Sequence, residues 1–137
     1  MKVHYSEALE QIAYYQNRYN TRFEISEIYS LFPKGEEYGF TVSWPFLNEG
    51  GVYLILDENQ NVIYVGKADI FGKRLYGHFR EDKETGECVI QGPNWINKPH
   101  YIINIKVEKD RLYENLSLEG YLIKVLDPED NIRGRDK

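Results

Sequence analysis

The stretch GVYLILDENQNVIYVG, residues 51–66, decides the fold. Its two ends have the β-branched and aromatic composition of strands, and the DENQN between them has the composition of a turn. We therefore expect a β-hairpin. Because side chains alternate along a strand, Tyr53 and Ile55 share one face and Val52 lies on the other. Tyr64, on the second strand, then lies near Tyr53 across the hairpin.

The chain after the hairpin has a helical pattern over residues 70–81. Its apolar positions recur every four residues and form the expected buried stripe: Phe71, Leu75 and Phe79. Arg74 and His78 are also four apart, so a continuous helix would place them side by side in a neighbouring row. This pattern alone favours a solvated polar face, and the functional alternative is a phosphate clamp by Arg74 with a proton-transferring or water-positioning His78.

The segment before residue 51 has helical patterns. Residues 6–20 predict a helix with Ser6 as its N-cap. A second, short helix is predicted from an i, i+3, i+4, i+7 pattern that Pro33 ends: Ile25, Ile28, Tyr29 and Phe32. Residues 39–44 are a candidate edge strand. We place a boundary at the break around residue 50, which divides the chain into an N-terminal extension, residues 1–50, and a core, residues 51–137.

Toward the C-terminus the sequence predicts a long loop over residues 84–99 and a third strand over residues 101–107. The last helix starts near Asp110 and is stopped by Pro128. A 4-3-4-3 spacing marks its expected core-facing stripe: Leu112, Leu116, Glu119, Ile123 and Leu126. One position of this apolar stripe is therefore a glutamate.

Glu119 is the strongest anomaly in the sequence. A carboxylate on a buried stripe is costly unless it is paired or binds a metal. It can instead lie at the rim of the stripe and reach solvent, and the stripe alone favours that reading. The functional alternative is a metal ligand, because Mg²⁺ commonly takes only one or two carboxylates and keeps its waters.

Composition bounds the class of protein. The chain has 137 residues, 42% of them hydrophobic and 15% aromatic, which fits an ordered globular fold rather than a disordered one. The single cysteine, Cys88, has no partner for a disulfide and no metal-cluster spacing. No apolar run is long enough to span a membrane, and the N-terminus has no apolar secretory region. We expect a cytoplasmic protein with no membrane partner.

The charge argues against a generic nucleic-acid binder, because the net charge is −5. The acidity is uneven, however. Residues 63–83, directly after the first strand of the hairpin and its turn, hold five Lys and Arg against three Asp and Glu. Local potential steers a polyanion more than the total does, so this basic stretch is the expected nucleic-acid contact.

Several motifs taken together resemble the GIY-YIG nuclease superfamily: GVY at 51–53, VIYVGKA at 62–68, KRL at 73–75, His78, LEGYLI at 118–123, Pro128 and Asn131. They are similar to the N-terminal incision domain of the bacterial excision-repair nuclease, which usually has Tyr where His78 stands. Histidine at that position is common in restriction-type members. The resemblance covers about residues 51–135 and implies an α+β fold, with a small three-stranded antiparallel or mixed sheet flanked by helices.

The resemblance also implies roles for individual residues. Tyr64 matches the general base that activates water, and Tyr53 matches the residue that orients it by hydrogen bonding. The other implied catalytic residues are Lys67, Arg74, His78, Glu119 and Asn131. Glu119 matches the ligand of one divalent cation, Mg²⁺ or Mn²⁺. The implied contacts to DNA are Lys67, Lys73, Arg74 and Arg80.

The leading hypothesis is a metal-dependent endonuclease that hydrolyses DNA phosphodiesters. The alternative is a nucleic-acid-binding or protein-interaction module that reuses the fold without cutting, which the acidic N-terminal segment favours. A purely structural α+β domain is the third reading, and it leaves Glu119 without a role. The sequence leaves the form of DNA, the sequence preference, the oligomeric state and the role of residues 1–50 open.

Overall fold

The predicted hairpin is present as strands β4 (Gly51–Leu56) and β5 (Asn61–Ala68). A computed structural model describes residues 2–32, 44–91 and 95–131. The two strands pair antiparallel with Ile55 opposite Tyr64 and Tyr53 opposite Gly66. Tyr53 and Ile55 pack in one apolar cluster and Val52 packs in the other, so the predicted faces are confirmed.

The turn of the hairpin is organised by Asp57. Its Oδ1 accepts hydrogen bonds from the backbone N–H groups of Asn59 and Asn61, each at 2.9 Å, and its Oδ2 lies 3.2 Å from Lys2 Nζ. Burial acts to raise the pKa of Asp57, but these hydrogen bonds outweigh it and leave the pKa lowered. The carboxylate thus fixes the register of the two strands that carry the tyrosines.

The sheet is larger than the expected three strands. The predicted third strand is present as β8 (Tyr101–Lys106), which pairs with β4 and completes the central three. Three two-residue strands extend the sheet: β1 (Val3–His4) beside β5, and β2 (Glu24–Ile25) and β3 (Tyr29–Ser30) beside β8. The result is one six-stranded antiparallel sheet in the described part of the chain, in the order β1-β5-β4-β8-β2 with β3 also on β8.

The second helix predicted before Pro33 is wrong. Residues 24–30 form β2 and β3 instead, because the free edge of β8 offers unpaired backbone groups that a local helical pattern does not reveal. Ser26 joins the two short strands to β8: its N–H donates to Asn104 O and its Oγ accepts from Asn104 N, both at 2.9 Å. The described part of residues 1–50 is therefore one helix with strands on both edges of the sheet, rather than a mainly helical extension. The division at residue 50 stays a prediction.

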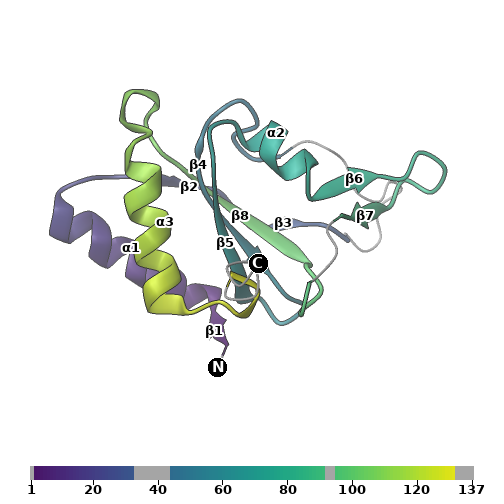
Figure 1. Ribbon diagram of the computed structural model, residues 1–137, viewed down its shortest axis with the longest axis horizontal. Coiled ribbons are helices and arrows are strands. Elements are labelled where there is room, and N and C mark those ends of the chain that lie inside the picture. The colour runs from purple at the N-terminus through teal and green to yellow at the C-terminus, as the bar shows by residue number, and fades with distance from the viewer. Residues whose placement is uncertain (1, 33–43, 92–94, 132–137) are drawn as a thin grey trace.

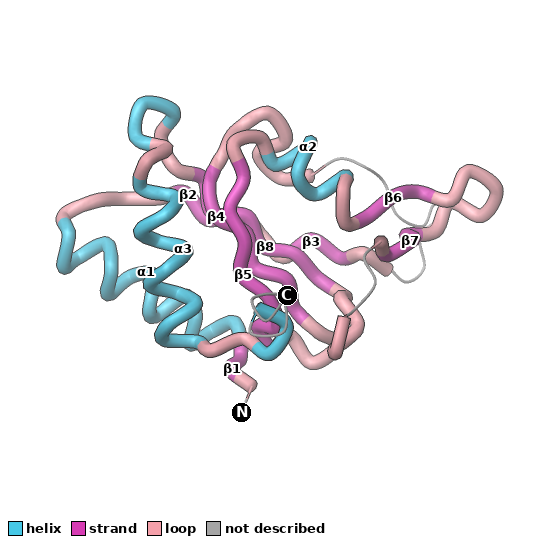
Figure 2. The backbone as a smooth tube through the Cα atoms, in the orientation of Figure 1, coloured by secondary structure: helices cyan, strands magenta, loops and turns pink. Residues whose placement is uncertain are grey.

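Two helices cover one face of the sheet, α1 (Tyr5–Tyr19) and α3 (Glu114–Leu126), which follows the 3₁₀ turn η1 (Lys109–Arg111). Figures 1 and 2 show both helices on the same side of β5. Residues from both helices and the strands share one core, among them Ala8, Ile12 and Leu122. The N-cap of α1 is His4 rather than the predicted Ser6, because His4 Nδ1 accepts from Ser6 N.

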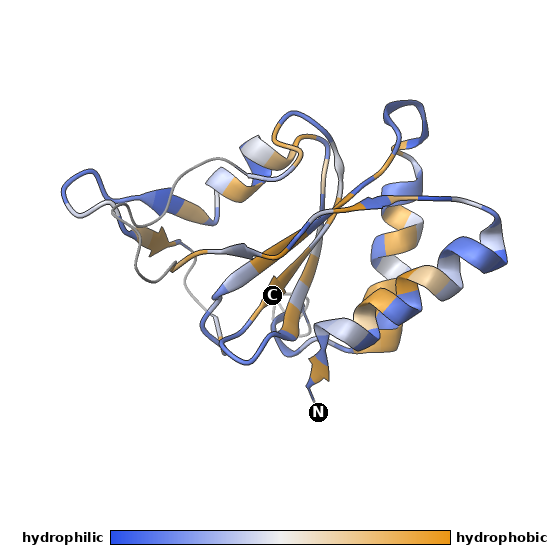
Figure 3. Ribbon diagram, turned by 180° about the vertical axis from the view of Figure 1, so that it is seen from behind, coloured by the Kyte–Doolittle hydropathy of each residue, from blue (hydrophilic) through white to orange (hydrophobic). Residues whose placement is uncertain are grey.

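The opposite face carries helix α2 (Phe71–Tyr76), which is shorter than predicted. After Gly77 the chain forms β6 (Phe79–Glu81), which pairs with β7 (Cys88–Ile90) inside the segment expected to be a loop. Phe71, Leu75 and Phe79 are all buried here, so the apolar stripe is real although the helix stops within it. Figure 3 shows the apolar strands of the sheet, whereas the tip between β6 and β7 is hydrophilic.

The last helix is present, but its buried stripe is displaced from the predicted one. Its buried residues are Asn115, Leu118, Leu122 and Leu126, and the predicted Leu116 is 68% exposed. The helix ends at Leu126 with Asp127 in the left-handed conformation, just before Pro128. Glu119 consequently lies at the edge of the stripe and is half-buried.

Two predictions fall on other parts of the molecule. The candidate edge strand over residues 39–44 lies outside the described residues except for Trp44, which is buried and packs against Tyr29 and Phe79. Among the helices that the structure describes, none has the length and apolarity needed to cross a membrane.

Candidate active site

The candidate site is built around Tyr53, which is fully buried on β4. Its ring lies across the neighbouring strand at Gly66: a Cβ at that position would overlap Tyr53 Cζ and Oη. The glycine of the YVG motif is therefore required by the path of the tyrosine. Gly51 is equally constrained, because a Cβ there would overlap the carbonyl of Ile105 on β8.

The Tyr53 hydroxyl joins two side chains from the segment that follows the hairpin. Arg74 Nε donates to it at 3.3 Å, and His78 Nε2 lies 3.1 Å from it. The predicted proximity of Arg74 and His78 thus exists, although it arises through Tyr53 and not from a shared helix, because α2 ends at Tyr76. Burial raises the pKa of Tyr53 well above its ordinary value, and the charge of Tyr64 adds to the rise. Tyr53 is therefore a neutral phenol.

His78 is neutral at physiological pH. Burial, and secondarily the charge of Arg74, lowers its pKa to about 4. Since the Tyr53 oxygen accepts from Arg74, its proton is free to point at His78 Nε2, which accepts it in the neutral ring. The chain Arg74 to Tyr53 to His78 fixes the direction of each hydrogen bond.

Tyr64 lies beside this chain and is less deeply buried than Tyr53. The two tyrosine rings are 6.1 Å apart between centroids. The ring of Tyr64 meets His78 and Trp95 edge to face, at 6.0 and 5.6 Å. The hydrogen bond that Arg74 donates to Tyr53 is the first cause of its raised pKa, and one to Tyr64 adds to it, so both hydroxyls lie by the guanidinium. Of the two tyrosines, Tyr64 is the one whose side chain reaches solvent.

Asn131, at the end of the described chain, holds the strand that carries Tyr64. Its Oδ1 accepts from Val65 N at 2.7 Å and its Nδ2 donates to Val65 O at 2.8 Å. At Val65, between Tyr64 and Gly66, the Asn131 amide makes the two backbone hydrogen bonds that a neighbouring strand would otherwise make. Asn131 is buried, and it acts on the site by positioning the backbone.

Glu119 faces the site from α3, since its charge contributes to the raised pKa of Tyr53. In the described residues no three His, Cys, Asp or Glu side chains gather into a metal cluster. A cage made by the protein alone is therefore not the expected kind of site there. One half-buried carboxylate fits a cation such as Mg²⁺ or Mn²⁺ that keeps several waters and shares oxygens with a phosphate.

The remaining predicted cations lie outside this cluster. Lys67 is exposed at the end of β5, on the opposite side of the strand from Tyr64 and Gly66. Lys73 is exposed on α2, and Arg80 on β6 stacks over the ring of Tyr76 at 4.8 Å. Only Arg74 of the four predicted contacts to DNA touches the buried tyrosine.

Two residues of the site were missed from the sequence. Trp95 lies in the segment predicted as a loop and closes over Tyr64 and His78. Asp130 is buried and accepts from Ile96 N at 2.6 Å, so it ties the residues next to Trp95 to the C-terminal segment that carries Asn131. No local spacing could have revealed a contact across more than thirty residues of chain, but a tryptophan in a long predicted loop was a signal.

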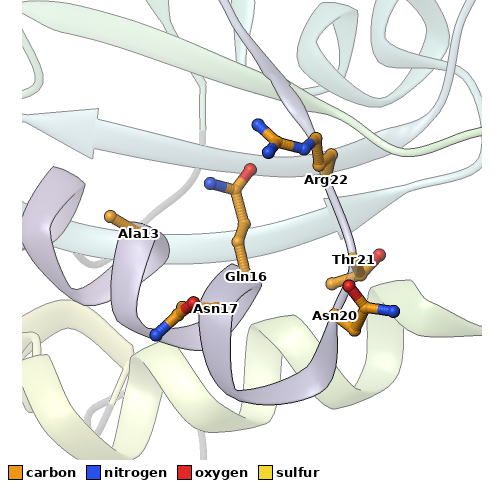
Figure 4. Close-up of a pocket in the computed structure, with 6 residues that line it drawn as sticks. All are labelled: Ala13, Gln16, Asn17, Asn20, Thr21 and Arg22. Carbon is orange, nitrogen blue, oxygen red and sulfur yellow. The ribbon is translucent and has the colours of Figure 1, made fainter.

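A hollow that is separate from the tyrosine site lies at the end of α1 (Figure 4). Its volume is about 200 Å³, and polar side chains such as Gln16, Asn20 and Arg22 line it. Gln16 Oε1 already accepts from Phe23 N at 2.8 Å, and Thr21 bonds both Glu114 and Arg111. These bonds join α1 to the start of α3 and give the hollow a structural role.

Comparison with known proteins places the same residues in one family. The family described as "UvrC-like GIY-YIG domain" matches residues 49–132. Curated relatives are the UvrABC system protein C of Pseudoalteromonas translucida, 36% identical over 89 residues, and that of Dechloromonas aromatica, 39% identical over 87 residues. The protein of the same name from Rickettsia prowazekii is 37% identical over 86 residues.

The matches cover 63–65% of this chain but only 13–14% of the length of those three relatives. No solved structure matches significantly.

Proposed function

This chain belongs to the family of UvrC-like GIY-YIG domains, and from that premise we propose that it is an endonuclease that hydrolyses DNA phosphodiester bonds. One observation carries the proposal: Arg74 and a neutral His78 meet at the hydroxyl of Tyr53, within a cluster that also holds the ring of Tyr64 and feels the charge of Glu119. A purely structural cluster of this kind would not need a charged guanidinium against a buried phenol.

The proposed reaction is an in-line attack of water on phosphorus. Tyr64 Oη, acting as the general base, takes a proton from the attacking water while the new P–O bond forms and the bond to the leaving oxygen breaks. Arg74 Nε is held by Tyr53, which leaves the terminal nitrogens of the guanidinium to bind the phosphate and stabilise its growing negative charge. His78 holds Tyr53, and through it Arg74, in position.

Glu119 is the residue proposed to hold one divalent cation, Mg²⁺ or Mn²⁺. Such a cation would supply positive charge next to the leaving oxygen. The protein supplies the rest of the site: Asn131 holds the backbone of the strand that carries Tyr64, and Trp95 packs edge to face against the ring of Tyr64.

The test is a cleavage panel with single-stranded, duplex, branched and damaged DNA in Mg²⁺ or Mn²⁺. We expect cleavage by the wild type and a loss of at least about a hundredfold in Glu119→Ala and Arg74→Ala, the size typical of lost electrostatic stabilisation. Glu10→Ala, which removes an exposed carboxylate on α1, is the matched control and should keep its activity. The proposal fails if the wild type cuts none of the DNA forms, or if Glu119→Ala cuts as fast as the wild type.

The second candidate is a module that binds nucleic acid or protein without cutting, which the net charge of −5 favours. DNA binding that is independent of metal, without cleavage of any DNA form, would support this module. Thermal stabilisation by Mg²⁺ or Mn²⁺ that disappears in Glu119→Ala would support the enzyme.

A further inference from the structure

A groove of about 450 Å³ lies beside the candidate site. On one side it is lined by the end of β5 and by α2, with Lys67, Asp69 and Arg74. On the other side it is lined by the start of α3, with Tyr113, Asn115 and Leu116. Figure 1 shows α2 and the start of α3 at the same end of the sheet. Arg74 belongs both to the Tyr53 cluster and to the lining of the groove. The groove therefore continues directly from the proposed phosphate position.

Asn115 lies in the wall of this groove with half of its amide unsatisfied. The side chain is only 4% exposed, and its Nδ2 donates to Ala68 O at 3.1 Å, which fixes the orientation of the amide. Its Oδ1 is buried and has no hydrogen-bond partner in the part of the chain that the structure describes. Leaving an amide oxygen without a donor costs about 1–3 kcal/mol, so a ligand that brings an N–H group into the groove is favoured.

The rim of the groove is apolar. Tyr113 is 74% exposed and Leu116 is 68% exposed, an unusual amount of apolar surface to leave in water next to two cations. An exposed aromatic ring beside Lys and Arg is the arrangement on which proteins stack single nucleobases, with the cations on the backbone phosphates. Asp69 is a second hydrogen-bond acceptor in the groove and repels a bare phosphate there, so the ligand inside the groove is a base rather than a second phosphate.

We propose that this groove holds one unstacked nucleobase next to the scissile phosphate, with Asn115 Oδ1 accepting a hydrogen bond from the exocyclic amino group of adenine or cytosine. Thymine presents a carbonyl oxygen where those bases carry the amino group, so it is disfavoured. A base in a duplex is stacked and paired and must first be extruded, so the preferred substrate has an unpaired nucleotide at the cleavage position. The inference rests on the proposed function, because it takes Arg74 as the contact to the phosphate.

The test is binding, measured by fluorescence anisotropy in EDTA so that no turnover occurs. The probes are labelled duplexes with one unpaired nucleotide at a junction with single-stranded DNA, and that nucleotide is A, C, T or abasic. We expect the wild type to bind A and C about three- to tenfold more tightly than T, and the abasic probe most weakly, in line with one hydrogen bond and one stacking contact. Asn115→Ala should bind the three base-bearing probes equally, and Tyr113→Ala should bind all of them like the abasic probe.

Tyr14→Ala is the matched control, since Tyr14 is 55% exposed on α1 and does not line the groove. Because Tyr113 is exposed, its variant should fold even where the buried Asn115 variant does not. Equal affinity of the wild type for all four probes, or unchanged binding by Tyr113→Ala, would overturn the inference.

Cleavage of the same probes in Mg²⁺ separates this inference from the proposed function. Cleavage that is independent of the unpaired base and of Tyr113 leaves the nuclease standing and removes the base-binding groove. Base-dependent binding without cleavage of any probe retains the groove and removes the nuclease.

Discussion

At the scale of single residues, the chemistry depends on keeping Tyr53 neutral and its hydrogen bonds directed. The buried phenol accepts from Arg74 and points its proton at a histidine whose pKa is lowered to about 4. Burial raises the pKa of Tyr53, and this effect is larger than that of the Arg74 guanidinium, which lowers it. Tyr53 is thus suited to orienting Arg74, which agrees with the proposal of Tyr64 as the base.

The histidine gives a pH dependence of stability. Its folded-state pKa is about 4 against an ordinary value of 6.5, so between these values the unfolded chain binds a proton that the folded chain does not. The free energy of unfolding is therefore highest above about pH 6.5, where His78 is neutral in both states. It falls as the pH drops from 6.5 toward 4, because protons bind the unfolded chain first. We expect a loss on the order of 2 kcal/mol, after allowance for the partial exposure of the ring. Urea unfolding at several pH values measures it.

The control for that measurement is His78→Gln, which keeps an acceptor for Tyr53 and does not titrate. The difference in unfolding free energy between the wild type and this variant should shrink as the pH falls from 6.5 to 4, since titrations elsewhere cancel. A difference that stays constant over that range would contradict the pKa of about 4.

Two glycines provide a matched pair of substitutions. A Cβ on Gly66 would overlap the ring of Tyr53, whereas a Cβ on Gly120 has no atom outside its own helix within 4 Å. Gly66→Ala should therefore destabilise the fold by about 2 kcal/mol or more through overpacking and weaken DNA cleavage by displacing Tyr53. Gly120→Ala, on an exposed turn of α3, should stabilise it by about 0.5–1 kcal/mol. Thermal melts measure both variants, and equal stability of Gly66→Ala and Gly120→Ala would contradict the close packing of Tyr53 on Gly66.

At the scale of elements, the site is assembled by short pieces that brace the hairpin. Asn131 is the clearest case, because two hydrogen bonds to Val65 hold the strand between Tyr64 and Gly66. Asn131→Ala leaves a buried N–H and C=O without partners and should cost about 2–3 kcal/mol. Asn131→Asp keeps the acceptor for Val65 N but replaces the donor with a buried charge, and it should also be destabilised. Denaturant unfolding measures both, and a variant as stable as the wild type would show that the amide bonds are dispensable.

The elements also differ in how far the sequence alone could predict them. Strands β4, β5 and β8 were predictable because their composition and alternation are local. Residues 25–32 have a helical spacing as well, but they form β2 and β3 because a distant strand edge pairs with them. The helix predicted through His78 stops at Tyr76, since the chain that follows pairs with β7. The buried stripe of α3 was misplaced, so Asn115 was not noticed, and the role of Glu119 stays a prediction.

At the scale of the whole molecule, residues 3–32 share one hydrophobic core with residues 49–132, the part that matches the family. Ala8, Ile12 and Tyr15 of α1 pack in the same cluster as Val52 of β4 and Leu118 of α3. Tyr15 Oη also lies 2.7 Å from Ser117 Oγ, and Tyr121 Oη donates to Gln11 Oε1 at 2.7 Å. These contacts place α1 against the helix that carries Glu119, so the N-terminal segment supports the position of the carboxylate.

This shared interior predicts one cooperative unfolding transition. Ile12 is fully buried, so Ile12→Ala should cost about 2–5 kcal/mol, and the loss should appear equally in every signal. The measurement compares helix content by circular dichroism with Trp95 fluorescence in a Trp44→Phe background, where Trp95 reports on the tyrosine site. If residues 1–50 were an independent domain, Ile12→Ala would shift only part of the circular dichroism signal and leave the Trp95 transition in place. Coincident shifts of both signals would instead make α1 a structural requirement for the site at Tyr64.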